Sequence, residues 1–471
     1  MHPNRARAAV ATYPRSMRHA AALLLLAGAL LLAFPAHAEL VVGTRTVGHG
    51  VKVWYTQNDT APVVDIVLSF EGAGTASDPE GKAGRAAFAA AMLTEGAGTM
   101  DSVAFRRALD EKAIVMEMQA EDDRLTVHLY ALREHATRAG QLLALALSKP
   151  QLAEVDQARM KADMRSLLAR MNERPSYHAQ RLLMQRGFKG HPYANAPYGD
   201  ANSIAALTAQ DVRDYVSTYI TRGNVLIAAS GDIDTALLDD VLEPVVDALA
   251  KNDSGAVAVT QTTLQGGGET VRKTMEAPQT TVLFAAPFVA RDDARFYAAY
   301  LLNHILGGSG LFSRLGDEVR QKKGLVYSVQ SDIEIKRGAA LITGALSTRN
   351  ATADEAIREV KTTLETLHTK GITTEECADA KSGVIGAYAR KLDGNGAIAQ
   401  QLLAMQIHGL GEDYINAREA LFNKVSCGDI NAVAEEFLSP SRFVFSVVGG
   451  APESGSAAPM AAGTLSHSDI K

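Results

Sequence analysis

The chain of 471 residues is poor in cysteine, a residue on which many metal and redox sites depend. It contains only two cysteines, Cys377 and Cys427. Two thiols cannot complete an all-cysteine zinc site, which takes about four ligands, and neither thiol is close in sequence to a plausible base. The pair is compatible with a structural disulfide or with two buried thiols, and the sequence leaves that choice open.

Other absences exclude further classes of protein. The chain has 47 Lys+Arg against 53 Asp+Glu, a formal net charge of −6, and no basic patch stands out, so nucleic acid is not an expected partner. It has no convincing G-x-S-x-G elbow or Cys/His nucleophile arrangement. The glycine-rich stretch at residues 307–310 is not followed by Gly-Lys-Ser/Thr, which argues against a phosphate-binding loop.

The one long apolar run lies close to the N-terminus. Basic residues precede an apolar run over residues 20–34, and Ala36-His37-Ala38 follows it. This pattern predicts a signal peptide, 1–38, that is cleaved after Ala38, and hence a periplasmic protein in a bacterium. A membrane anchor is the alternative, but about 15 residues are fewer than the roughly 20 that span a bilayer. No later stretch is long and apolar enough, so we expect no transmembrane segment in the mature protein.

The remainder of the chain shows the pattern of a degenerate duplication. In each half a strand precedes an apolar helix, and a later helix opens on a hydroxyl residue three positions before an acid. The strands begin at residues 63 and 280, and the hydroxyl residues are Thr208 and Ser426. The offsets, 280 − 63 = 217 and 426 − 208 = 218, are almost equal. Two copies of one design are therefore expected.

Strands alternate with amphipathic helices inside each half. Residues 124–132 alternate as a strand does, and residues 134–147 have helical spacing. We predict an α+β fold of two homologous α/β sandwich lobes, with helices packed on one face of each sheet. The segment between the lobes is rich in Gly, Ser, Thr and Gln, and part of it suits an edge strand. The predicted divisions are an N-terminal lobe, a linker, a C-terminal lobe and a disordered tail, at 39–250, 251–273, 274–450 and 451–471.

The helix expected in the first copy carries a recognisable frame. Residues 84–99 read GRAAFAAAMLTEGAGT, with glycines flanking small and apolar residues. This frame resembles the one around the inverted zinc motif H-x-x-E-H of the pitrilysin/insulinase-type metallopeptidases. Ala87, Ala90 and Ala91 stand where that motif has two histidine ligands and a glutamate base. A methyl group neither binds a metal ion nor moves a proton, so the resemblance implies a peptidase fold with a degenerate zinc site.

The resemblance extends over roughly residues 41–450. Residues 190–193, Gly-His-Pro-Tyr, resemble a turn of the family, and a further glutamate ligand of its catalytic members lies on a later helix. The corresponding residues here are 166–168, Ser-Leu-Leu, and the nearest acids are Asp163 and Glu173. Because all the ligands are missing together, the resemblance implies no metal and no cofactor in this chain, and zinc in a partner subunit.

The remaining histidines do not suggest a replacement site. His128, His135, His191 and His304 fall on different expected elements, and no pair has the spacing of helix ligands with an acid nearby. Spacing alone leaves a cluster in space open, but we expect surface or structural histidines.

The second half keeps a segment that the resemblance connects with substrate. Ser-Arg-Leu at 313–315 is followed by Arg320 and then by Gly-Leu-Val-Tyr, which ends at Tyr327. This resembles the family's S-R-L…L-R-x-x-x-G-L-x-Y segment, whose Arg and Tyr reach the zinc lobe and hold the substrate. An arginine offers five fixed donors to peptide oxygens, and a tyrosine hydroxyl can stabilise an oxyanion. The alternative is an ion-paired Arg320 and a core position for Tyr327.

The glycine-rich loop before this segment has two interpretations. Gly307, Gly308 and Gly310 allow a close backbone approach to a partner or a substrate, or they simply end a helix in a turn. The sequence does not decide between them.

Together these features predict a non-catalytic subunit. The resemblance implies a half-clamp that pairs with a zinc-bearing paralogous subunit as a heterodimer, is inactive alone, and contributes Arg320 and Tyr327 to the partner's active site. The substrate would be a peptide or an unfolded segment. The alternative is an envelope scaffold or peptide-binding protein with no proteolytic role, which would not need those two residues. A hydrolase with a different metal site is a third possibility that no ligand pattern supports.

Overall fold

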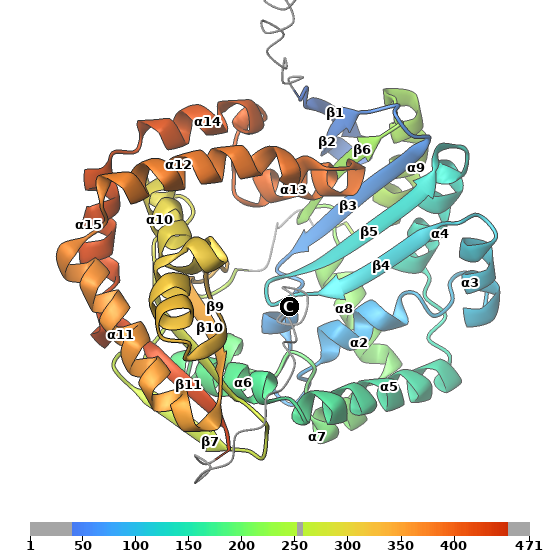
Figure 1. The fold of residues 1–471 in the computed structure, drawn as a ribbon. Coiled ribbons are helices and arrows are strands. Elements are labelled where there is room, and N and C mark those ends of the chain that lie inside the picture. The colour runs from blue at the N-terminus through green and yellow to red at the C-terminus, as the bar shows by residue number, and fades with distance from the viewer. Residues whose placement is uncertain (1–39, 252–257, 451–471) are drawn as a thin grey trace, which may run out of the picture. The chain divides into compact units, whose positions relative to one another are not determined.

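The computed structural model describes residues 40–251 and 258–450 (Figure 1). The predicted signal peptide and the predicted tail lie outside the described residues. The described residues from Val41 onward belong to one compact unit. Within the described residues, no helix combines the length and the apolar character needed to cross a membrane.

The first half builds a six-stranded sheet in the order β1-β2-β6-β3-β5-β4. In β5, every second residue from Leu125 to Ala131 is buried, and the residues between them are half-buried. This period of two turns one face of the strand to the core, as the sequence predicts. The strands are β1 (Gly43–Val47), β2 (Val51–Gln57), β3 (Val63–Glu71), β4 (Val115–Ala120), β5 (Arg124–Leu132) and β6 (Val225–Gly231).

Helices cover the apolar face of this sheet and share a core that includes Phe70, Phe88 and Tyr215. The expected hydroxyl-acid helix start is present, since Thr208 and Asp211 form a capping box at the beginning of α8. The helices of this half are α2 (Arg85–Met92), α3 (Ser102–Asp110), α4 (Ala136–Ser148), α5 (Glu154–Asn172), α6 (Pro175–Gly187), α7 (Ala201–Ala206), α8 (Ala209–Tyr219) and α9 (Thr235–Ala248).

The second half repeats the plan with a five-stranded sheet in the order β7-β11-β8-β10-β9. Its strands are β7 (Thr270–Thr274), β8 (Thr280–Pro287), β9 (Val326–Ile335), β10 (Ala340–Thr348) and β11 (Val444–Gly449). Its helices are α10 (Phe296–Asn303), α11 (Ala353–Lys370), α12 (Thr374–Tyr388), α13 (Asn395–Ile407), α14 (Tyr414–Lys424) and α15 (Cys427–Phe437). β7 is an edge strand of this sheet and overlaps the end of the predicted linker, 251–273.

The two sheets have the same connectivity. The order β6-β3-β5-β4 in the first sheet matches β11-β8-β10-β9 in the second, strand for strand in the chain. Ser426 and Asp429 repeat at α15 the capping box of α8. The α+β fold of two duplicated lobes is therefore confirmed.

One helix of each half packs on the sheet of the other half. α6 lies against β8 and β11, where Leu183 and Met184 join an apolar cluster with Leu283 and Val444. α13 lies against β3 and β6 of the first sheet (Figure 1). The sequence predicted helices on only one face of each sheet. That prediction is incomplete, because a helix of the other half covers the second face. The four domain boundaries stay a prediction.

The two cysteines, which the sequence left undecided, form a disulfide. Cys377 near the start of α12 is bonded to Cys427 at the start of α15, with their Cα atoms 5.7 Å apart. The bond ties two helices of the second half together.

Buried hydrogen bonds connect the β4–β5 turn with the β9–β10 turn. The hydroxyl of Tyr193 donates to Asp123 Oδ1 at 2.7 Å and accepts from the backbone N–H of Gly338 at 2.9 Å. Asp123 Oδ2 accepts from the backbone N–H of Arg337 at 2.8 Å. Tyr193 belongs to the Gly-His-Pro-Tyr turn, so this turn has a structural role that its sequence did not reveal.

Removing this carboxylate should destabilise the protein. Asp123 is only 5% exposed, and Asp123→Ala leaves one buried donor, the Tyr193 hydroxyl, and one partly buried donor, the Arg337 N–H, without this acceptor. We expect a loss of about 2–4 kcal/mol in the free energy of unfolding, measured by urea denaturation at neutral pH. Asp123→Asn keeps one carbonyl acceptor and should lose less. Equal stability of the alanine variant and the parent would contradict this account.

Candidate functional site

The helix that carries the degenerate motif is anchored by a buried carboxylate at its N-terminus. Asp78 accepts hydrogen bonds from the backbone N–H groups of Gly84 and Ala86 at 2.8 and 2.9 Å, and lies 3.6 Å from the Arg85 guanidinium. Burial outweighs these contacts and raises the pKa of Asp78 to about 6. Gly84 has φ +88°, and a Cβ there would come within 2.8 Å of the Tyr198 carbonyl oxygen. α2 therefore has a well-defined position.

The motif positions on this helix present only methyl groups. Ala87 and Ala91 are one turn apart on a half-buried face of α2, and Ala90 is 3% exposed in the core. On α5, which packs beside α2, Asp163 is exposed, and Glu173, which follows the last residue of that helix, is exposed too. Among residues 40–251 and 258–450, no three His, Cys, Asp or Glu residues are placed to hold a metal ion together. That the chain works without a metal stays a prediction.

A buried acid just after the motif helix is already paired with an arginine. Glu95, just after α2, pairs with Arg159 of α5 at 2.6 Å, and the same guanidinium pairs with Asp156 at 2.8 Å. Glu95 and Asp156 are each 5% exposed. This network fastens α5 to the end of α2. It was not predicted from the sequence because Glu95 lies 64 positions before Arg159 in the chain.

The four histidines considered from the sequence have separate surroundings. His128 bonds Asp65 at 3.0 Å, and this bond raises the pKa of the His128 imidazole. His191 Nε2 lies 3.1 Å from the Thr260 carbonyl oxygen, and His135 lies 3.7 Å from Glu134. Burial lowers the pKa of His304, and the Lys391 charge adds to this effect. The structure brings none of them into a common cluster.

Arg320 and Tyr327 flank one turn of the second half. Arg320 lies in a π-helical turn, η7 (Gly316–Lys322), and Tyr327 is the second residue of β9. Between them, Gly324 has φ +61° and donates its N–H to the Arg320 carbonyl oxygen at 3.0 Å. This glycine lets the chain turn sharply from η7 into the strand.

The side chains of both residues are available to a binding partner. Arg320 is exposed, and no described residue forms an ion pair or hydrogen bond with its guanidinium. Tyr327 is 36% exposed, and the structure gives its hydroxyl no partner among the described residues. The alternative of an ion-paired arginine and a core tyrosine is therefore not what the structure shows. The substrate-binding role of the two residues stays a prediction.

Glycine stands at each of the three loop positions for a different structural reason. A Cβ at Gly307 would lie 2.4 Å from the Ser331 backbone nitrogen, so this glycine lets the helix end pack against β9. Gly308 ends the π-helical turn η5 (His304–Gly308). Gly310 has φ +62° with open space around its Cα. The turn interpretation accounts for all three, and only Gly310 leaves room for a partner.

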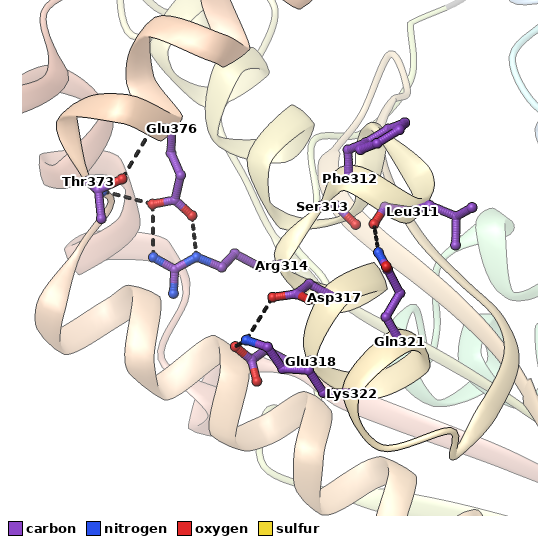
Figure 2. A pocket seen from close by; sticks show the side chains of 10 residues that line it. All are labelled: Leu311, Phe312, Ser313, Arg314, Asp317, Glu318, Gln321, Lys322, Thr373 and Glu376. Atoms are coloured by element: carbon purple, nitrogen blue, oxygen red, sulfur yellow. Dashed lines mark hydrogen bonds and ion pairs between the residues drawn. The ribbon is translucent and has the colours of Figure 1, made fainter.

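A hollow of about 450 Å³ lies beside this loop (Figure 2). Its charged groups are already paired, since Arg314 binds Glu376 through two hydrogen bonds and Lys322 lies 2.8 Å from Asp317. Two apolar residues at its rim are not covered: Phe312 is 93% exposed and Leu311 is 43% exposed. A bond of 2.6 Å from Gln321 Nε2 to the Leu311 carbonyl oxygen braces the turn.

Such a braced, exposed aromatic residue is typical of a protein contact rather than of catalysis. Phe312 was not predicted to be functional from the sequence. Its only signal was a large apolar residue within a glycine-rich loop.

Comparison with known proteins agrees with the geometry. Residues 206–384 match the family model described as the peptidase M16 inactive domain. The chain is 27% identical over 339 residues to the "non-peptidase homolog YmxG" of Helicobacter pylori, covering 72% of this chain and 77% of that protein. It is 23% identical over 348 residues to the "uncharacterized zinc protease YmxG" of Bacillus subtilis, covering 74% and 84%.

Solved structures show the same fold. The peptidase M16 inactive domain from Pseudomonas fluorescens superposes with a TM-score of 0.81 at 27% identity, over 87% of this chain and 98% of that one. A chain of complex III2 from Candida albicans superposes with a TM-score of 0.73 at 17% identity, over 87% and 96%, a likeness that concerns the fold alone.

The duplicated fold and the alanine-bearing motif helix define a peptidase-like protein that lacks the family's zinc ligands. In sequence and in fold the chain is similar to inactive homologues of the pitrilysin/insulinase-type, or M16, metallopeptidases, and residues 206–384 match the inactive domain of that family.

Restoring the motif should not restore catalysis. The triple variant Ala87→His, Ala90→Glu, Ala91→His supplies two histidines and a base, but α5 offers no third ligand that faces them. We expect no zinc-dependent cleavage of a quenched peptide and substoichiometric zinc by metal analysis. Adding Leu167→Glu is the matched comparison, because it supplies a carboxylate in the corresponding region. Robust cleavage by the triple variant would contradict this account of α5.

Proposed function

We propose that this protein is the non-catalytic, substrate-binding subunit of a heterodimeric periplasmic zinc peptidase that degrades or processes peptides or unfolded segments. The partner is a zinc-bearing paralogous subunit, and Arg320 and Tyr327 act in its active site. One observation carries the proposal: a chain whose motif helix presents alanines keeps Arg320 and Tyr327 exposed, without partners among the described residues, on either side of one turn.

The strand that carries Tyr327 supports binding of an extended peptide. β9 is the last strand of its sheet and pairs only with β10 in the described structure. An edge strand offers unpaired backbone N–H and C=O groups that can bond an added strand. A peptide added to the start of β9 would pass beside the Tyr327 hydroxyl, where it can donate to a carbonyl oxygen.

Two further features are compatible with the proposed compartment and assembly. The disulfide between Cys377 and Cys427 suits an oxidising compartment such as the periplasm. The exposed Phe312 beside the same segment suits a contact with a second subunit.

An envelope scaffold or peptide-binding protein with no proteolytic role remains the second candidate. The exposed Phe312 and the free edge of β9 serve that function equally well. The two candidates differ in what they require of Arg320 and Tyr327, since only the first needs them for turnover.

The deciding experiment compares this chain alone with the chain co-expressed with a zinc-motif relative from the same genome. We expect a stable complex, cleavage of a quenched peptide only in the mixture, and zinc stoichiometric with the relative. A complex without any enhancement of the relative's own activity would favour the scaffold. Full activity of the relative alone, unchanged by this chain, would overturn the proposal.

A further inference from the structure

A cluster of aromatic rings in the second half surrounds two arginines that form no ion pair with an acid of the described residues. Arg418 of α14 lies with its guanidinium carbon 4.0 Å from the ring centre of Tyr388 and 4.4 Å from that of Phe422. Arg291, in the loop before α10, lies 4.2 Å from the ring centre of Phe296 and 5.6 Å from that of Tyr414. The charges of both arginines act on Tyr414, so the two arginines share this neighbour.

The charge of Arg418 is buried without compensation. The residue is 6% exposed, and none of the described carboxylates forms an ion pair with it. Its guanidinium donates a hydrogen bond to the Val384 carbonyl oxygen, at a long 3.3 Å. Ring faces attract a cation but accept few of its five N–H groups, and a buried guanidinium normally has a carboxylate beside it.

A second buried group in the same cluster lacks a partner. The hydroxyl oxygen of Tyr388 is buried, and no described atom forms a hydrogen bond with it. Leaving such a hydroxyl unbonded is unfavourable. Because the Tyr388 ring stacks directly on Arg418, one acceptor could satisfy both groups.

The surroundings favour a negative charge. Lys391 lies 3.5 Å from the Tyr300 hydroxyl, at the border of the cluster. Burial lowers the pKa of His408 to about 4, and the positive charges of Arg291 and Arg124 add to that effect. Tyr297, Tyr300, Tyr388 and Tyr414 are each only half-buried, so the cluster reaches the protein surface.

We propose that Arg418, Arg291 and Tyr388 form a binding site for a carboxylate. The planar guanidinium of Arg418 matches a carboxylate in two-point geometry, the Tyr388 hydroxyl donates a third hydrogen bond, and Arg291 supplies further positive charge. The carboxylate belongs to a peptide, as its C-terminus or as an acidic side chain. The site is separate from Arg320 and Tyr327 and does not depend on a zinc-bearing partner.

The test is calorimetric titration of the purified chain alone with three short peptides. They are acetyl-tetraalanine with a free C-terminus, its C-terminal amide, and an amide in which the third residue is aspartate. We expect the free acid, the aspartyl amide, or both, to bind at least about tenfold more tightly than the plain amide. Which of the two binds identifies the source of the carboxylate. Equal binding of all three peptides, or binding of none, would overturn the proposal.

Substitutions then test whether the carboxylate binds at this cluster. Tyr388→Phe removes only an unbonded hydroxyl, so it should leave the fold intact and weaken carboxylate binding by about fivefold. Arg418→Lys keeps the charge but loses the planar fork, and should weaken binding by about tenfold or more. Arg442→Met is the control, because Arg442 stacks on Phe437 at 5.2 Å outside the cluster. Unchanged affinity in both test variants would show that the carboxylate binds elsewhere. Since no cleavage is measured, failure here leaves the proposed subunit function untouched.

Discussion

Tyr327→Phe should lower the turnover of the assembled peptidase complex by roughly 100-fold and leave the complex itself intact. The variant loses only a hydroxyl that is exposed at the start of β9 and has no partner among the described residues. A donor aimed at a developing oxyanion contributes about 10²–10³ in kcat when it acts in a transition state. Turnover of a quenched peptide, with assembly followed by size-exclusion chromatography, measures the effect.

Arg320→Ala should change KM more than kcat. A guanidinium that holds the peptide in both ground and transition states contributes to KM more than to kcat, so KM should rise by about tenfold. Gln330→Ala is the matched control, because Gln330 is also exposed on β9 but has no assigned role. Unchanged turnover and unchanged KM in both test variants would refute the assigned roles.

Removing the disulfide should produce the largest loss of stability among the changes considered. Cys377 and Cys427 are 50 residues apart in the chain, and closing a loop of that length restricts the unfolded state by roughly 4 kcal/mol in the chain-entropy account. The double variant Cys377→Ser, Cys427→Ser should therefore unfold at a clearly lower guanidinium concentration than the parent.

A reducing agent provides the control for this effect. It should lower the unfolding midpoint of the parent towards that of the double variant and leave the double variant unchanged. Identical midpoints for the oxidised parent, the reduced parent and the variant would show that the bond does not stabilise the protein.

Local patterns anticipated much of the fold. The strand predicted at 124–132 is β5, and the hydroxyl-acid pairs at Thr208 and Ser426 begin α8 and α15. These elements were predictable because strand alternation and helix capping depend on residues a few positions apart. The helix expected in the frame at residues 84–99 is found as α2, at Arg85–Met92.

The candidate site was predictable only in part. Resemblance to a family motif identified the degenerate zinc positions Ala87, Ala90 and Ala91. Resemblance to a second motif identified Arg320 and Tyr327. Phe312 was missed because only its exposure distinguishes it from a core aromatic residue. The Arg418 cluster was missed because its members come from three helices and a loop, far apart in sequence.

The sequence by itself determined the duplicated α+β design and the loss of every zinc ligand at the family's motif positions, since both depend on which residue types occur at which spacing. Only the tertiary structure decided that α6 and α13 each pack on the other half's sheet, that Tyr193 and Asp123 join two distant turns, and that Cys377 is bonded to Cys427. Those contacts connect residues from about 50 to more than 260 positions apart, as the bond from Ser446 to Ala179 illustrates. Local propensity carries no information about such pairs, because burial and hydrogen bonding select them only when the whole chain is packed.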